Sequence, residues 1–113
     1  MDFKTMKVQC DGNKAIAVVL EKRIYLGITD VFRDEMLSLL ETKFQQLIID
    51  LSHVAVMNSA GLGVLIMAQD MIKKGNGRIK IANLQPLMQE IFARMRLDTL
   101  FEMYDTLEEA VAN

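Results

Sequence analysis

Blocks of hydrophobic and polar positions follow one another along the chain, and the period of each block predicts its element. The apolar runs 15–20 and 47–51 are short and continuous, which is typical of strands covered on both faces. Residues 78–82 alternate polar and apolar side chains, as half-buried strands do. Segments 3–9 and 100–104 are weaker candidates for an edge strand and a last strand. The pattern therefore predicts up to five strands.

Two longer segments show the spacing of amphipathic helices. Phe32, Met36, Leu39 and Leu40 recur at helical intervals, which predicts a helix over 30–43 with Thr29-Asp30 as its N-cap and acidic first turn. A second helix is expected over 59–74. Its end is marked by Lys73-Lys74-Gly75, because basic residues and a following glycine favour helix termination.

The last third of the chain adds two more helices. An apolar stripe runs from Leu87 to Met95, with Pro86 near its start, where proline is tolerated. Thr106 and Glu109 have the spacing of a capping box for a short C-terminal helix. Alternation of strands and helices on this scale implies an α/β fold with a largely parallel or mixed sheet.

Composition and charge exclude several classes of function. With 113 residues, 51% of them hydrophobic, the chain is expected to fold as one domain over residues 1–113. A net charge of −2 argues against nucleic acid as a partner. Cys10 has no second cysteine to pair with, and His53 has no ligand cluster around it, so we expect no disulfide, metal or cofactor.

The apolar segments are also too short to be targeting or membrane-inserting elements. The first residues lack the apolar core of a signal peptide. The longest apolar run, 60–68, is far shorter than a bilayer-spanning helix. We therefore expect a cytoplasmic domain without direct membrane insertion.

The segment 47–65 carries the candidate chemistry, because function in open α/β sheets tends to lie beyond the carboxyl ends of strands. Asp50 ends a buried strand and is expected to anchor the following loop by hydrogen bonds. Asn58 and Ser59 are both good cap residues for the helix that follows. Gly61 and Gly63 are poor helix formers, so their presence indicates close packing or a contact surface.

Ser59 allows two interpretations. It is either a helix cap or a hydroxyl that accepts a phosphate, since a helix N-terminus tolerates an anion. A phosphate there would place a bulky charge of about −1.5 to −2 on the loop and so switch the binding of a partner. The local pattern favours the cap, because such caps are common.

The whole segment 47–65 matches a longer signature than the cap residues alone. Asp50-Leu51-Ser52, the apolar loop, and Asn58-Ser59-Ala60-Gly61-Leu62-Gly63 resemble the signature of STAS-domain anti-sigma-factor antagonists. The resemblance extends over 79–84, 91–101 and 106–110. It implies the STAS-type fold, a mixed, mainly parallel central sheet of about four to five strands packed with about four helices.

The resemblance also implies a function, that of a regulatory binding domain rather than an enzyme, with no catalytic residue. Members bind a cognate anti-sigma factor, often a serine kinase of the histidine-kinase ATPase type, and thereby release a sigma factor for transcription. The kinase phosphorylates the serine of the signature, here Ser59, and a PP2C-like phosphatase reverses this. The implied partner surface is Met57, Asn58, Ser59, Ala60, Gly61 and Leu62.

Two departures from the family pattern define an alternative. Asn58 replaces the acidic residue before the serine, and Lys22 and Tyr25 stand where the family often has Gly and Asp. Loss of the acidic charge is compatible with a non-phosphorylated STAS adaptor subunit, as found in signalling complexes and in phospholipid-transport ABC systems.

Two further interpretations concern individual side chains. One interpretation is a hydrolase triad of Asp50, His53 and Ser59. A nucleophile elbow, however, requires glycine at the position that Met57 occupies. We therefore expect His53 to be an ordinary loop residue. Of the nine methionines, those on helical stripes (Met36, Met88 and Met95) are expected in the core. Met57 and Met67 are the better candidates for an interface.

Overall fold

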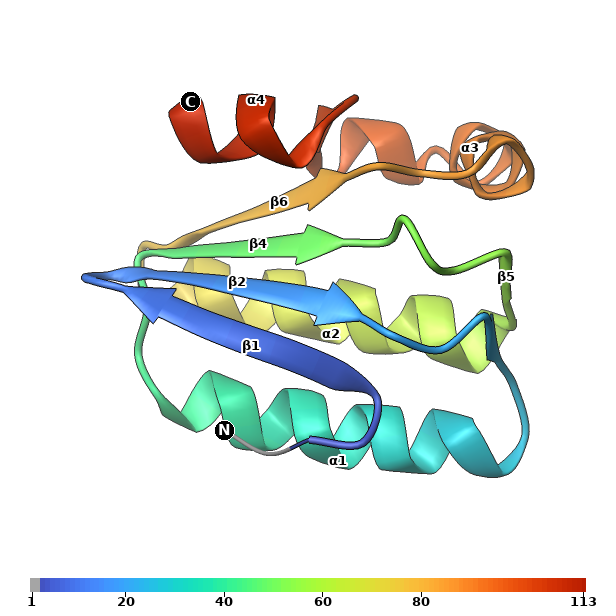
Figure 1. Ribbon diagram of the computed structural model, residues 1–113, viewed down its shortest axis with the longest axis horizontal. Coiled ribbons are helices and arrows are strands. Elements are labelled where there is room, and N and C mark those ends of the chain that lie inside the picture. The colour runs from blue at the N-terminus through green and yellow to red at the C-terminus, as the bar shows by residue number, and fades with distance from the viewer. Residues whose placement is uncertain (1–2) are drawn as a thin grey trace.

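A five-stranded mixed sheet forms the centre of the computed structural model, which describes residues 3–113 (Figure 1). Its strands are β1 (Met6–Asp11), β2 (Lys14–Val19), β4 (Gln46–Asp50), β6 (Arg78–Ala82) and β7 (Glu102–Tyr104). Their order is β1-β2-β4-β6-β7. The β1–β2 hairpin is antiparallel and the other three pairings are parallel, as the strand–helix alternation predicts.

Helices cover the two faces of the sheet unequally. Figure 1 shows α1 (Gly27–Glu41) and α2 (Ser59–Lys74) side by side on one face and α4 (Leu107–Ala112) on the other. The remaining helices, α3 (Pro86–Arg94) and the 3₁₀ turn η1 (Leu97–Thr99), connect β6 to β7. The main core lies under α1 and α2, where Phe32, Leu39, Leu47, Ile49 and Leu65 are fully buried.

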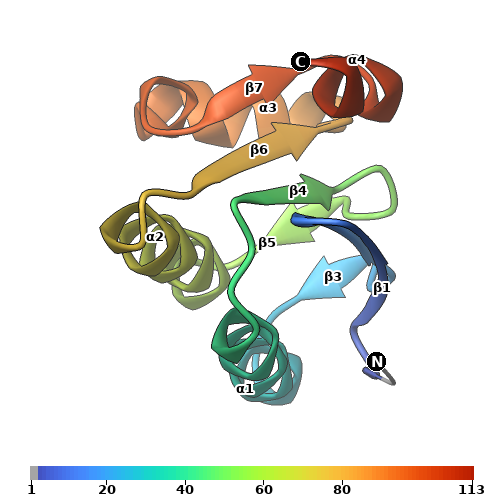
Figure 2. The same ribbon diagram turned by 90° about the vertical axis from the view of Figure 1, so that its left-hand side faces the viewer.

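A second, two-stranded sheet lies beyond the carboxyl ends of the central strands. Its strands are β3 (Arg23–Ile24) and β5 (Val56–Met57), which pair in parallel (Figure 2). The sequence analysis did not predict this sheet, because two-residue strands are too short to show a period. It matters because it fixes the two segments that enter α1 and α2.

One face of β2 is covered less than expected. The sequence predicts a strand buried on both sides, but burial alternates along β2, and Ile16 and Val18 are only half-buried. The reason is that α4 packs on β4, β6 and β7 and does not reach across the whole sheet. A small second core of Ile48, Ala82 and Ala110 lies under this helix.

Two other expectations were wrong. The first helix begins at Gly27, so Thr29 is not its N-cap; Thr29 is a buried residue of the first turn. Met95 follows the last residue of α3 and is exposed rather than part of the core. Met36 and Met88 are buried as predicted. Within residues 3–113, no helix combines the length and the apolar character needed to cross a bilayer.

Candidate functional site

Asp50 ties the loop after β4 to the neighbouring connection. It is the last residue of β4 and is largely buried. Its Oδ1 accepts the backbone N–H of Ser52 at 2.9 Å and the Nδ2–H of Asn83, which follows β6, at 3.3 Å. The amide of Gln85 donates to the Ser52 carbonyl at 2.8 Å. The predicted anchoring role of Asp50 is therefore confirmed, and its hydrogen bonds go to Ser52 and Asn83 rather than to His53.

The second half of the loop is held by the β3–β5 sheet. Ala55 N–H donates to the Lys22 carbonyl at 2.8 Å, and Asn58 N–H donates to the Ile24 carbonyl at 2.9 Å. Ile24 and Met57, which face each other in the register, are both buried. The start of α2 is thus held in place by backbone hydrogen bonds and by apolar packing.

Asn58, and not Ser59, is the N-cap of α2. Its Oδ1 accepts the Gly61 N–H at 2.7 Å, and its backbone is extended, as a cap residue requires. Thr29 Oγ1 lies 3.4 Å from the same oxygen and donates a longer hydrogen bond to it. Ser59 is consequently the first residue inside the helix, and it is exposed.

The six residues of the expected partner surface divide into two groups. Ser59 and Ala60 are exposed and Asn58 is half-buried, so these three reach the surface. Met57, Gly61 and Leu62 are buried, and Met57 exposes only 3% of its area. Met57 therefore offers little surface of its own, and its side chain packs beneath the loop. Met67 is half-buried and lines a surface groove.

The surroundings of Gly61 and of Gly63 differ. A Cβ on Gly61 would lie 2.5 Å from Met57 Cγ and 3.0 Å from Ile24 Cγ2, so close packing requires glycine there. A Cβ on Gly63 would meet nothing within 4 Å. The expectation of close packing is confirmed for Gly61, whereas Gly63 faces open space.

The start of α1 adds an exposed apolar side chain, that of Leu26, which the sequence analysis did not single out. Leu26, the residue before α1, has φ 46° and ψ −127°, a backbone conformation that strongly favours glycine, and 77% of its area is exposed. Tyr25 beside it is also exposed. The hydrogen bond from Asn58 to Ile24 places this segment next to the start of α2. No periodic signal marks a strained single residue.

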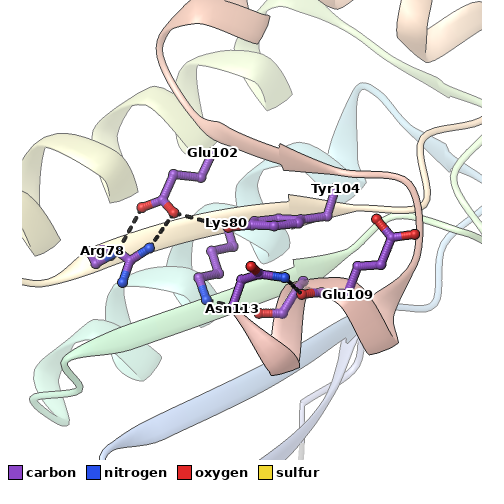
Figure 3. A network of polar contacts seen from close by, with 7 residues as sticks. Arg78, Lys80, Glu102, Tyr104, Glu109 and Asn113 are labelled. Atoms are coloured by element: carbon purple, nitrogen blue, oxygen red, sulfur yellow. Dashed lines mark hydrogen bonds and ion pairs between the residues drawn. The ribbon is translucent and has the colours of Figure 1, made fainter.

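A separate polar cluster lies on the opposite face of the sheet (Figure 3). Lys80 is fully buried beneath α4, and its Nζ donates to the Ala110 carbonyl at 2.9 Å and lies 5.5 Å from the centre of the Tyr104 ring. Burial lowers the pKa of Lys80, and the nearby Arg78 charge lowers it further. Lys14 Nζ donates to the next carbonyl, that of Val111, at 3.3 Å.

The cluster continues as an ion pair between neighbouring strands. Arg78 donates two hydrogen bonds to the Glu102 carboxylate, at 2.8 and 2.5 Å. Hydrogen bonding from Arg78 holds the pKa of Glu102 below its usual value. Burial and the Glu102 charge raise the pKa of Tyr104, whose hydroxyl donates to Glu102 at 3.2 Å. These contacts attach α4 and β7 to the sheet and are remote from Ser59.

Among the described residues, no group of three or more His, Cys, Asp or Glu side chains is arranged to hold a metal ion. The start of α2 combines the exposed hydroxyl of Ser59, a loop held by hydrogen bonds, and the exposed Tyr25 and Leu26 of the neighbouring segment. These features lie on a small α/β domain.

Comparison with known families agrees with this class. The family model of the STAS domain matches residues 6–110, so the chain belongs to the STAS domain family. The fold also matches solved structures of low sequence identity. An anti-sigma factor antagonist from Mycobacterium paratuberculosis is 22% identical, with a TM-score of 0.85 over 96% of this chain and 91% of that one.

Two other structures extend the comparison. An anti-sigma-factor antagonist (STAS) domain protein from Planctomyces limnophilus is 17% identical, with a TM-score of 0.85 over 95% of this chain and 94% of that one. The phosphorylated form of the Bacillus cell fate determinant SpoIIAA is 16% identical, with a TM-score of 0.72 over 95% of this chain and 96% of that one. These similarities confirm the predicted STAS-type fold.

Proposed function

We propose that this chain is an anti-sigma-factor antagonist switched by reversible phosphorylation of Ser59. In this role it is a binding protein and not an enzyme. It binds an anti-sigma factor of the histidine-kinase ATPase type through the start of α2 and so releases a sigma factor. The proposal is supported by family membership, since several solved STAS structures are named as such antagonists.

The observation that carries the switch is the division of labour between Asn58 and Ser59. Because Asn58 supplies the cap, the Ser59 hydroxyl is not needed for helix stability and is exposed to a kinase. A phosphate at the first residue of the helix is favourably placed relative to the helix dipole, so the fold tolerates it.

The same phosphate would block docking. No charged residue occurs between Ser59 and Asp70, so the exposed face of α2 starts without charge. A dianion of about −1.5 to −2 would add both bulk and charge at the edge of this surface. A partner that buries the start of α2 would have to desolvate that charge, which is costly. A PP2C-like phosphatase would restore binding.

The test is phosphorylation by each purified ATPase-type anti-sigma kinase of the source organism, followed by intact-mass measurement. We expect one added phosphate on the wild type and on Ser52→Ala, and none on Ser59→Ala. Ser52 is a matched control because it is also exposed and lies in the loop that leads to α2. Phosphate on the Ser59→Ala protein would show that the modified residue is elsewhere.

A second candidate function follows from Asn58. The absence of an acidic charge beside Ser59 favours a STAS adaptor that docks without phosphorylation, in a signalling complex or a phospholipid-transport ABC system. In that case an anti-sigma kinase that is active on its cognate antagonist would leave this chain unmodified. Pull-down would then recover a transporter ATPase or a signalling complex rather than an anti-sigma kinase.

A further inference from the structure

The edge strand β1 lacks most of the features that protect the edges of sheets from pairing. Its one neighbour in the described part of the chain is β2 (Figure 2). Its six residues pair with β2 in a continuous register, so no bulge twists the edge away, and none of them is a proline. The opposite edge, β7, is only three residues long, which is a common form of protection. The free side of β1 is therefore open to another strand.

The backbone groups at this free side belong to the even-numbered residues of β1. Leu20 N–H donates to the Thr5 carbonyl at 2.8 Å, and these two residues lie opposite each other when the β1–β2 register is continued by one residue. Because hydrogen-bonded pairs alternate along an antiparallel ladder, the odd-numbered residues of β1 bond to β2. The N–H and C=O groups of Val8 and Cys10 therefore point away from β2, toward the free side.

Two opposite charges flank the middle of the strand on one face. Val8 packs against the core under α1 and α2, and side chains alternate along a strand, so Lys7, Gln9 and Asp11 point to the other face of the sheet. All three are exposed. Among residues 3–113 the ion pairs lie elsewhere, and neither Lys7 nor Asp11 takes part in one. Each charge is two residues from Gln9, so the strand is complementary to a reversed copy of itself.

One antiparallel register of two β1 strands satisfies both the backbone and the charges. With Gln9 at the two-fold axis, Val8 lies opposite Cys10 of the second copy, and the outward groups of these two residues form hydrogen-bonded pairs. Lys7 then lies opposite Asp11 of the second copy, and the symmetry repeats this pair. An axis at Lys7 or Asp11 would place like charges opposite each other. An axis at Val8 or Cys10 would leave both charges unmatched.

We propose that two copies of this chain form a symmetric dimer by antiparallel pairing of residues 7–11 of β1 about Gln9, which joins their central sheets at this edge. The interface is isologous, and because it is small the dimer forms reversibly with concentration. Asp11 lies opposite Lys14, which is level with the amino end of β4, whereas Ser59 follows the carboxyl end of that strand. The pairing uses no residue of the start of α2, so it does not depend on the proposed function.

The first measurement is the mass of the full chain in solution. Sedimentation equilibrium under reducing conditions, over a concentration series that reaches the millimolar range, should show the mass rising from 12.8 kDa toward twice that value. A mass that stays at 12.8 kDa over the whole series would overturn the inference.

Charge reversal tests the register by the same measurement. Lys7→Glu and Asp11→Lys should each weaken self-association about tenfold or more, because two attractive pairs become repulsive. An equimolar mixture of the two variants should associate again, since every pair across the mixed dimer has opposite charges. Lys73→Glu, at an exposed position of α2, is the control for the change in net charge and should associate like the wild type. A mixture that stays monomeric would contradict the pairing.

A cysteine at the two-fold axis gives a readout that only this register allows. In a Cys10→Ser background, Gln9→Cys should form an intermolecular disulfide under mild oxidation, because the Cα atoms of a non-hydrogen-bonded pair are about 4.5 Å apart. Asp11→Cys in the same background is the matched control, since its two copies would lie about 14 Å apart along the strands, too far for a disulfide. Equal cross-linking at both positions, or none at residue 9, would overturn the proposed dimer.

Discussion

The Oδ1 atom of Asn58 accepts the N–H of Gly61 at 2.7 Å, and this bond starts α2. It also explains why the residue after it is free for another use. If Ser59 itself capped the helix, phosphorylation of its hydroxyl would remove the cap hydrogen bond and destabilise the helix. Here the cap and the exposed hydroxyl are neighbours with separate roles, and each can be changed without the other.

Asn58→Ala should therefore destabilise the fold by about 1 kcal/mol, because the Gly61 N–H loses its acceptor. Asn58→Asp should keep the stability of the wild type or exceed it slightly, since a carboxylate caps equally well and the helix N-terminus favours its charge. Urea unfolding of both variants measures this. Ser59→Ala is the control and should change the unfolding free energy by less than Asn58→Ala does.

Gly61→Ala should be destabilising by about 1–3 kcal/mol, as expected for overpacking. The added methyl group would lie 2.5 Å from Met57 Cγ and 3.0 Å from Ile24 Cγ2, both in buried side chains of the β3–β5 sheet. Equal stability of Gly61→Ala and wild type, measured by urea unfolding, would mean that this packing adjusts freely.

The parts of the fold with strong end signals were predictable from the sequence. Both limits of α2 and both limits of β6 agree with the prediction, because cap residues, Lys73-Lys74-Gly75 and strict alternation mark them. The start of α1 was misplaced for a physical reason. Threonine is a residue type that is common at N-caps. The hydroxyl of Thr29, however, donates to Oδ1 of Asn58, which is distant in sequence.

Only those features of the candidate site that depend on residues adjacent in the sequence were predictable. Asn58 and Ser59 were both recognised as cap residues, but only the geometry shows which of them caps the helix. The surface groove that Met67 lines is formed by residues of α2 together with Leu100, which lies far from them in the chain, so no local pattern encodes it. Lys80 looked like a polar strand position, yet α4 covers it completely.

Lys80 gives a prediction about the attachment of α4. Lys80→Met keeps most of the buried side chain but removes the hydrogen bond to the Ala110 carbonyl, so its net effect on stability should be within about 1.5 kcal/mol. Lys80→Ala also leaves a cavity and should cost about 2–5 kcal/mol. In Lys80→Met, hydrogen exchange should become faster in residues 107–113 and stay unchanged in 46–50. Unchanged exchange in α4 would show that its apolar contacts alone hold it.

Glu102 gives a prediction about pH. Its pKa is lowered in the folded chain by the hydrogen bond from Arg78, so below its ordinary value of 4.5 the unfolded chain binds the proton more readily than the folded chain. The stabilisation from this carboxylate is fully present above pH 4.5 and is lost as the pH falls through the folded pKa. The pair is partly exposed, so we expect about 1 kcal/mol or less.

The measurement compares wild type with Glu102→Gln by urea unfolding near neutral pH and well below pH 4.5. The wild type should be the more stable protein at neutral pH, and the difference should shrink in acid, because a protonated Glu102 resembles glutamine in charge. Glu41→Gln, an exposed position at the end of α1, controls for general loss of negative charge. A difference between wild type and Glu102→Gln that does not change with pH would mean that Glu102 acts through packing rather than through its charge.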